Sequence, residues 1–112
     1  AAAAVVRSSG RPWADEARRF IAANLARPIT IAGLARRLGR SPSFITHRFP
    51  AEFGMPLHRY LMQARLAAAR QRIEAGAGLR RTAAELGFCD EFHLSRAFRA
   101  HWGRPPSAFK PR

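Results

Sequence analysis

The sequence predicts an all-α fold of about seven helices, in which two similar lobes are joined by a long central helix. Two observations lead to this prediction. One pattern of residues occurs twice along the chain, and the segments around it are bounded by residues that start or stop helices. Hydrophobic residues make up 47% of the 112 positions, which is ample for a core at this length.

The repeated pattern is an apolar helix, a glycine turn and a capped second helix. The first copy contains Ala35-x-x-Leu38-Gly39, Ser41, Phe49, Gly54-x-Pro56 and Tyr60. The second copy contains Ala83-x-x-Leu86-Gly87, Asp90, Phe98, Gly103-x-Pro105 and Phe109. The copies are 48 residues apart at the turn glycines and 49 residues apart from the caps onward, because the second turn has one extra residue. This arrangement is the signature of a helix-turn-helix, whose second helix fits a DNA major groove.

The first two helices are expected between Pro12 and Leu25 and between Thr30 and Gly39. Proline suits a first helical turn, threonine is a good N-cap, and glycine supplies the left-handed backbone of a helical end. Three-to-four spacing predicts which side chains face the core: Trp13, Ala17, Phe20, Ile21, Leu25, Ile31, Leu34, Ala35 and Leu38.

The third helix is expected to start at Ser41 as the cap, with Pro42 at its first position. Ile45 and Phe49 should face the core. Pro50 follows at once, and proline inside a helix removes a backbone hydrogen bond. We therefore expect this helix to end or kink early at Pro50.

A long central helix is expected from about Pro56 to Ala75, with Gly76 and Gly78 ending it. A helix of about 20 residues is about 30 Å long. That length is close to the roughly 34 Å of one DNA turn. We therefore expect a rigid spacer that sets two recognition helices into successive major grooves.

The second lobe repeats the first. Leu79, Ala83 and Leu86 should form its first helix, and Gly87 its turn, with Phe88 in the core. Asp90 should cap the second recognition helix. The inward residues of this helix should be Leu94, Phe98 and Trp102. A short final turn, Ser107 to Phe109, should pack back on the lobe.

These elements give a domain scheme. Residues 1–11 are expected to be the remnant of an interdomain linker, and residues 12–112 a DNA-binding domain. Within that domain, residues 12–54 form the first lobe, 55–76 the linking helix and 77–112 the second lobe. A signal-sensing part is expected before Ala1.

The charge of the chain indicates a polyanionic partner. Lys and Arg number 20 against 7 Asp and Glu, so the formal net charge is +13. Lys110 is the only lysine, and arginine binds phosphates and guanine edges with a planar pair of donors. A GC-rich genome also favours arginine. Nucleic acid is preferred over an anionic membrane as the partner.

Catalysis, cofactors and metals are not expected. The one cysteine, Cys89, excludes an internal disulfide and is expected to fill the turn beside Phe88. Cys89, His93 and His101 lack further evident ligands, so no metal site is predicted. No apolar run approaches the roughly 18 residues of a membrane span. The expected location is the bacterial cytoplasm, in association with the nucleoid.

The second copy resembles the DNA-binding domain of the AraC/XylS family of bacterial transcription regulators. The residues that carry the resemblance are Ala83-Ala84-Glu85-Leu86-Gly87-Phe88, Asp90, Leu94-Ser95-Arg96-Ala97-Phe98-Arg99 and Gly103-Arg104-Pro105-Pro106-Ser107-Ala108-Phe109. The resemblance covers about Trp13 to Arg112. It implies a seven-helix domain with two motifs, usually fused to a ligand-sensing or dimerising domain, and an activator that also contacts RNA polymerase.

The resemblance places base contacts on the outward faces of both second helices. In this sequence the candidates are Ser43, Thr46 and His47 in the first helix and Phe92, Ser95 and Arg96 in the second. The internal repeat agrees, because an offset of 49 residues maps the first three onto the second three in order. Pro50 stands where the family tends to have a basic residue, and Phe92 where a small polar residue is common.

Arg96 is the best single candidate, because guanidinium can bond guanine O6 and N7 together, worth about 1–3 kcal/mol of discrimination. A phosphate contact or an ion pair with Asp90 or Glu91 is the alternative. Ser95 and Thr46 could instead bond the backbone, His47 could be solvated, and Phe92 could belong to the core. Phosphate contacts are expected from a dense arginine set, with a log–log salt slope near −0.9 per phosphate. The set is Arg36, Arg37, Arg40, Arg48, Arg80, Arg81 and Arg99.

The sequence is also compatible with other functions. A non-specific architectural protein would bind any duplex through charge alone. A DNA-targeting module of an alkyl-transfer repair enzyme would have a reactive-cysteine domain before it. A membrane-active helix protein would need neither the glycine turns nor the caps. The isolated domain is expected to be a monomer that binds double-stranded DNA, with any dimer formed through a preceding domain.

Overall fold

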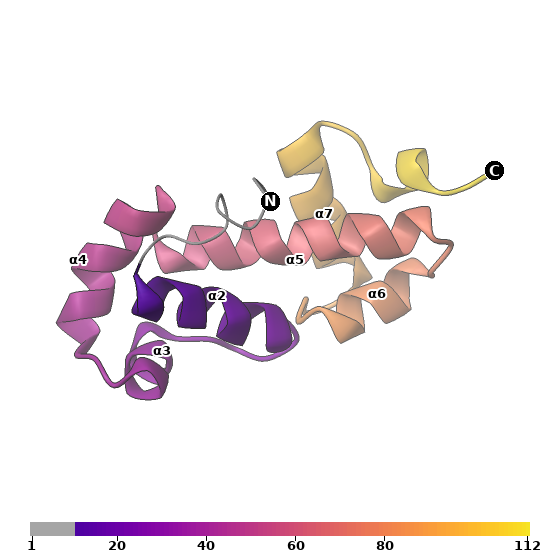
Figure 1. Cartoon of the computed structure of the whole chain (residues 1–112). Coiled ribbons are helices and arrows are strands. Elements are labelled where there is room, and N and C mark those ends of the chain that lie inside the picture. The colour runs from indigo at the N-terminus through magenta and orange to yellow at the C-terminus, as the bar shows by residue number, and fades with distance from the viewer. Residues whose placement is uncertain (1–10) are drawn as a thin grey trace, which may run out of the picture. The chain divides into compact units, whose positions relative to one another are not determined.

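The computed structural model describes residues 11–112, so nearly all of the expected linker, residues 1–10, lies outside the described residues. The described residues form six α-helices and one 3-10 helix and no strand (Figure 1), which confirms the all-α prediction. These elements are α2 (Pro12–Ala23), α3 (Ile31–Leu38), α4 (Pro42–Phe53), α5 (Leu57–Glu74), α6 (Leu79–Glu85), α7 (Glu91–Trp102) and η1 (Pro106–Phe109).

The chain divides into two compact units. The first unit contains the residues up to Asn24 together with Ile29–Tyr60, and the second contains Leu25–Pro28 together with Leu61–Arg112. The boundary therefore falls inside α5, after its first turn. The scheme of two lobes and a separate linking helix stays a prediction.

The first unit is built around one apolar cluster. The buried side chains come from α2, α3, α4 and the start of α5 and are Trp13, Ala14, Ala17, Ile21, Leu34, Ala35, Ile45, Phe49 and Leu57. The predicted inward face of α2 is therefore largely correct, although the helix ends at Ala23 rather than Leu25. Ile31 was expected inward but is 37% exposed, although it lies one turn before the buried Leu34 and Ala35.

Pro50 does not end α4 early, so the expectation of an early end was wrong. The helix continues to Phe53, three residues beyond the proline. The reason is tertiary packing of the last turn. The ring of Phe53 stacks on Phe49 at 4.0 Å between centroids and meets the edge of Tyr60 at 5.0 Å. Burial of these rings outweighs the one backbone hydrogen bond that proline cannot donate.

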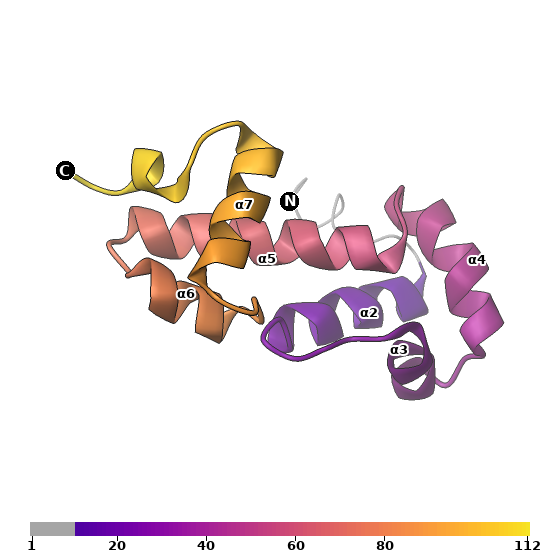
Figure 2. The ribbon, with the colours of Figure 1, turned by 180° about the vertical axis from the view of Figure 1, so that it is seen from behind.

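The second unit has its own core. Figures 1 and 2 show α6 beside α5 and α7 crossing it. The buried cluster draws on all three helices and the turn between α6 and α7, and consists of Leu66, Ala69, Ile73, Ala83, Leu86, Phe88, Leu94 and Phe98. As expected, Phe109 of η1 packs back, with its ring 5.1 Å from that of Phe98.

The segment Leu25–Pro28 is attached to the second unit by Arg65 of α5. The guanidinium of Arg65 donates to the carbonyl oxygens of Leu25 and Arg27, each at 2.8 Å. Partial burial lowers the pKa of Arg65, although the group stays protonated. Gly87, in the turn of the second motif, also lies close to Leu25–Pro28. A Cβ at Gly87 would lie 3.0 Å from the Leu25 carbonyl oxygen.

The sequence repeat is also a structural repeat. Helices α4 and α7 are both 12 residues long and start 49 residues apart. Each has a side-chain cap: Ser41 Oγ accepts from Phe44 N at 3.0 Å, and Asp90 Oδ1 accepts from His93 N at 2.7 Å. Each ends at a left-handed glycine, Gly54 with φ 76° or Gly103 with φ 72°. The predicted caps are confirmed.

The two turn glycines, Gly39 and Gly87, should tolerate alanine differently. Both have positive φ, 66° and 80°, so alanine should cost each about 1–2 kcal/mol of backbone strain. At Gly39 a Cβ meets nothing within 4 Å, whereas at Gly87 it meets backbone oxygens of Leu25 and Ala26 at 3.0 and 3.1 Å. Gly87→Ala should therefore destabilise more than Gly39→Ala when urea unfolding of the two variants is compared. Equal losses would contradict the close approach at Gly87.

Candidate nucleic-acid interface

The outward face of α4 is defined by its inward face. Ile45 and Phe49 are 0% and 1% exposed, and they fix the rotation of the helix. The three candidate base-reading residues of this helix, Ser43, Thr46 and His47, are all exposed as a result. The structure therefore places them together on one accessible face.

All three of these side chains have local polar contacts, and Ser43 Oγ lies 3.4 Å from His47 Nδ1. Thr46 Oγ1 donates to the Pro42 carbonyl at 3.0 Å, so the hydroxyl keeps only its lone pairs and the neighbouring methyl for other contacts. His47 Nδ1 lies 2.8 Å from the Ser43 carbonyl oxygen. Because a carbonyl only accepts, this bond requires the proton on Nδ1, and Nε2 is the ring nitrogen left for another group.

The outward face of α7 is fixed in the same way by Leu94 and Phe98, both 0% exposed. Phe92 is 65% exposed, so the alternative that it belongs to the core is wrong. Ser95 is half-buried and Arg96 is exposed. The three candidates of this helix thus share one face, as the repeat predicts.

Arg96 has no acidic partner within the described part of the chain. Asp90 accepts the cap hydrogen bond from His93 N, and Glu91 pairs with Arg80 at 3.5 Å. The predicted alternative, an ion pair of Arg96 with either acid, is not observed. Its guanidinium is therefore available to a ligand outside the chain.

All seven arginines proposed for phosphate contacts are exposed, but their surroundings differ. Arg80 and Arg81 are engaged by Glu91 and Glu85, at 3.5 and 3.0 Å. Arg37 lies over the ring of Phe20 at 5.7 Å. Arg40 and Arg48 both lie over the ring of Phe44.

The Phe44 contacts were missed by the sequence reasoning. Part of the signal was present, because Phe44 and Arg48 are four residues apart in α4 and so share one helical face. Arg40 lies in the turn before α4, where helical spacing predicts no contact. In the second unit, Arg70 and Arg104 both lie over the ring of Phe109, at 4.6 and 5.6 Å. Phe109 had been assigned to packing alone.

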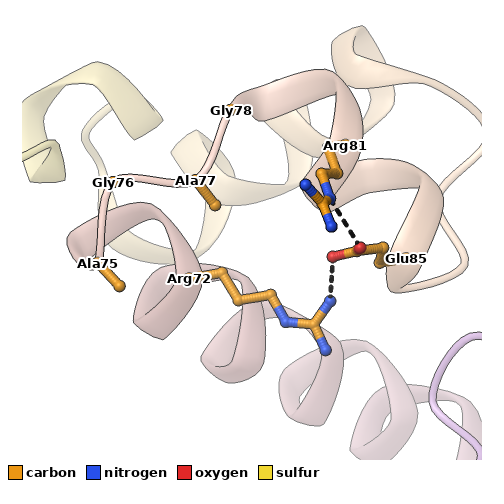
Figure 3. Close-up of a pocket in the computed structure, with 7 residues that line it drawn as sticks. All are labelled: Arg72, Ala75, Gly76, Ala77, Gly78, Arg81 and Glu85. Carbon is orange, nitrogen blue, oxygen red and sulfur yellow. Dashed lines mark hydrogen bonds and ion pairs between the residues drawn. The ribbon is translucent and has the colours of Figure 1, made fainter.

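Glu85 lies between two arginines at a hollow beside the α5–α6 turn (Figure 3). Its carboxylate oxygens accept from Arg81 Nε at 3.0 Å and from Arg72 Nη1 at 2.8 Å. Arg81 stands four residues before Glu85 in α6, and Arg72 reaches the carboxylate from α5. The hydrogen bond from Arg81, helped by the charges of both arginines, lowers the pKa of Glu85. The same contacts connect α6 to α5.

Cys89 is exposed, and the expectation that it fills the turn beside Phe88 was wrong. Its backbone amide, not its thiol, makes the local contact, donating to His93 Nδ1 at 3.4 Å. Among residues 11–112, no three His, Cys, Asp or Glu side chains converge on a point that suits a metal ion. None of the helices in this range is long and apolar enough to cross a membrane.

Residues 34–112 match a family model described as a helix-turn-helix domain, which is of the AraC type. The chain belongs to this family of DNA-binding domains. Its fold and family are those of transcription regulators and not of enzymes.

Similar proteins agree with this assignment. A probable AraC family transcriptional regulator from Rhodopseudomonas palustris is 26% identical, with a TM-score of 0.74 over 90% of this chain and 100% of that one. The DNA-binding domain of the global transcriptional factor AdpA, solved with a target DNA, is 24% identical, with a TM-score of 0.79 over 88% of each chain. The Msm operon regulatory protein of Streptococcus mutans is 21% identical over 104 residues. The match covers 92% of this chain but 37% of that relative, so this chain spans little more than a third of its length.

Glu85→Gln should destabilise the protein at neutral pH and not at low pH. The folded state lowers the pKa of Glu85, so the carboxylate stabilises the fold above its unfolded pKa, about 4.3 for ordinary glutamate. That contribution is lost as the pH falls through the folded pKa. The unfolding midpoints of wild type and variant should therefore differ at pH 7 and converge near pH 3.

Glu16→Gln is the matched control, since no ion pair of Glu16 is observed in the described range. Its midpoint should follow wild type more closely at both pH values. A Glu85→Gln difference that stays constant with pH would exclude the ion-pair explanation.

Proposed function

We propose that this domain binds a specific sequence of duplex DNA in two successive major grooves. It would regulate bacterial transcription as the output domain of a longer, ligand-responsive protein. The observation that carries the proposal is the pair of matched helices, α4 and α7, which have equal lengths and equivalent caps. Each exposes base-contacting residue types at the same three positions, in a chain of net charge +13.

In the second unit, Arg96 would donate to O6 and N7 of a guanine, because its guanidinium is exposed and has no acidic partner in the described range. Phe92 would lie against a thymine methyl group, since two thirds of its surface is exposed. Ser95, one turn from Phe92, would bond a base edge or a nearby phosphate.

In the first unit, the local hydrogen bonds limit what each side chain would offer. Thr46 would present its methyl group and oxygen lone pairs rather than its hydroxyl proton. Neutral His47 would present Nε2 as an acceptor, which suits an amino group of adenine or cytosine. Ser43 would complete this face.

The DNA backbone would be held by the exposed arginines. Arg36, Arg37, Arg40, Arg48 and Arg99 have no carboxylate partner among the described residues, so they would contact phosphates directly. Arg80 and Arg81 share their charge with Glu91 and Glu85, but they meet these acids through Nε and would keep their Nη groups for phosphate.

The wider assignments rest on the family. The AdpA domain was solved with its target DNA, which supports double-stranded DNA as the partner here. A sensing or dimerising domain before residue 1, a contact with RNA polymerase, activation rather than repression, and a cytoplasmic location are proposed for the whole protein. Association with the nucleoid, and a monomeric state for the isolated domain, are part of the same proposal.

The decisive experiment is selection of duplexes from a random library at about 150 mM salt, followed by affinities for the selected and a scrambled duplex. A specific reader should prefer its site by roughly 10³-fold or more. Two short enriched blocks about 10 base pairs apart would support both units as readers. One block would limit base reading to a single unit. No enriched sequence, with tight but salt-labile binding, would overturn the proposal in favour of the architectural alternative.

Arg96→Ala should relax the preference at one base pair of the selected site. Loss of a two-donor contact to guanine should cost about 1–3 kcal/mol for the preferred base and little for the other three. The measurement is a set of affinities for four duplexes that differ only at that base pair.

Arg99→Ala is the matched control, because Arg99 is also an exposed arginine of α7 but is proposed to bind phosphate. It should weaken binding to all four duplexes equally and reduce the salt slope by about 1. A uniform loss with Arg96→Ala would instead assign Arg96 to the backbone.

A further inference from the structure

Phe44 brings two arginine side chains together on the surface of the first unit. The guanidinium carbon of Arg40 lies 4.7 Å from the centre of the Phe44 ring, and that of Arg48 lies 5.5 Å from it. Arg40 comes from the turn before α4 and Arg48 from the middle of the helix. One aromatic ring therefore contacts an arginine that precedes the helix and another that lies within it.

The N-cap of α4 and the ring of Trp13 hold Phe44 in place. Its backbone amide donates to the capping hydroxyl of Ser41 at 3.0 Å, so Phe44 sits in the first, ordered turn of α4. Its ring meets Trp13 edge-on, with centroids 5.2 Å apart and an interplanar angle of 82°. Trp13 is only 7% exposed. The half-buried ring thus links the core to the charged surface.

No side-chain hydrogen bond of Arg40 or Arg48 is observed within the described residues, so the donors of both arginines remain available. A guanidinium that contacts an aromatic ring through its face keeps its N–H groups in its own plane, free to bond phosphate oxygens. Neither Arg40 nor Arg48 has a carboxylate within ion-pair distance among the described residues. From Ala17 to Ala51 the sequence contains seven arginines and no acidic residue. Glu52, four residues after Arg48, pairs with Arg11 at 3.1 Å instead. Arg40 and Arg48 therefore share one ring and have no ion-pair partner among the described residues.

At the equivalent positions of the repeat, the second unit has no such pair. Its own two arginines over one ring, Arg70 and Arg104, lie 4.6 and 5.6 Å from Phe109 of η1, and Arg70 is already paired with Glu74. The repeat maps Phe44 onto His93 and Arg48 onto Ala97. The His93 ring packs against Phe88, with centroids 5.4 Å apart, and accepts a hydrogen bond from the Cys89 amide. Acidic residues, Asp90 and Glu91, stand at the start of α7, where α4 has Ser41 and Pro42.

We infer that Phe44 is a positioning residue that presents Arg40 and Arg48 as a preformed phosphate clamp. The first unit then anchors the DNA backbone, and the second unit carries most of the sequence preference. The inference rests on the proposed function and adds a division of labour between its two motifs. The local hydrogen bonds of Thr46 and His47 agree with it, because they reduce what α4 offers to base edges.

Phe44→Leu tests the clamp, because leucine keeps an apolar side chain and removes the π face. Freezing a long side chain on binding costs a factor of roughly 2 to 10, so loss of order at two arginines should weaken binding by about 4- to 100-fold. The loss should be the same for the selected and the scrambled duplex, with the selected sequence unchanged. Phe44→Tyr keeps the aromatic face and should bind like wild type.

Phe44 also packs on Trp13, so a structural effect has to be separated from a positioning effect. Thermal melting of each variant identifies a temperature at which all variants are folded, and binding is measured at that temperature. Phe44→Leu is then added to the pair Arg40→Gln and Arg48→Gln, at a salt concentration low enough to measure weak binding. If Phe44 acts through the arginines, the substitution should have no further effect in this background.

The outcomes distinguish the two hypotheses. A Phe44→Leu loss that persists without the arginines, or that affects only the selected duplex, overturns the clamp and leaves the proposed function intact. Wild-type affinity for Phe44→Leu overturns it as well. If wild type prefers no sequence at all, the proposed function fails, yet a uniform loss that depends on the arginines still establishes the clamp.

Discussion

Burial of two side chains four residues apart is the constraint on which both recognition faces depend. In α4 these are Ile45 and Phe49, and in α7 they are Leu94 and Phe98, and none is more than 1% exposed. Four residues is close to one helical turn, so each pair fixes the rotation of its helix about its own axis. A side-chain cap and a left-handed glycine fix where the helix begins and ends. The positions on the opposite side of each helix therefore lie on its solvent side.

The distribution of acids decides which arginines are free. The seven acidic residues lie outside the stretch from Ala17 to Ala51, and most of them engage arginines that face their own unit. Glu85 shows this most clearly, because it binds Arg72 and Arg81 at once and joins α5 to α6 (Figure 3). Arg72 and Arg81 are thus paired within the second unit. Arg40 and Arg48 have no carboxylate partner among the described residues, because Glu52 of α4 pairs with Arg11. Such a surface attracts a polyanion, and its attraction weakens with salt.

Local signals made the fold and the candidate faces predictable. Ser41-Pro42, Asp90 and the turn glycines act within one helical turn, and the structure has each of them in its expected role. The predictions failed where residues distant in the sequence determine the structure. Pro50 breaks a local rule, but Phe53 is held by Phe49 and Tyr60. Ile31 and Cys89 are apolar by type, yet they stand where no neighbour covers them enough to bury them.

The sequence by itself determined the all-α class, the twofold repeat and the outward positions of the two recognition helices, because caps, glycines and helical periodicity are encoded by neighbours in the chain. Only the tertiary structure decided how far α4 extends, which arginines are paired with acids, and that Arg40 and Arg48 share Phe44. Those outcomes depend on which side chains meet across space. The ring of Phe44 is held by Trp13, 31 positions earlier in the sequence, and periodicity within one helix carries no information about such a contact.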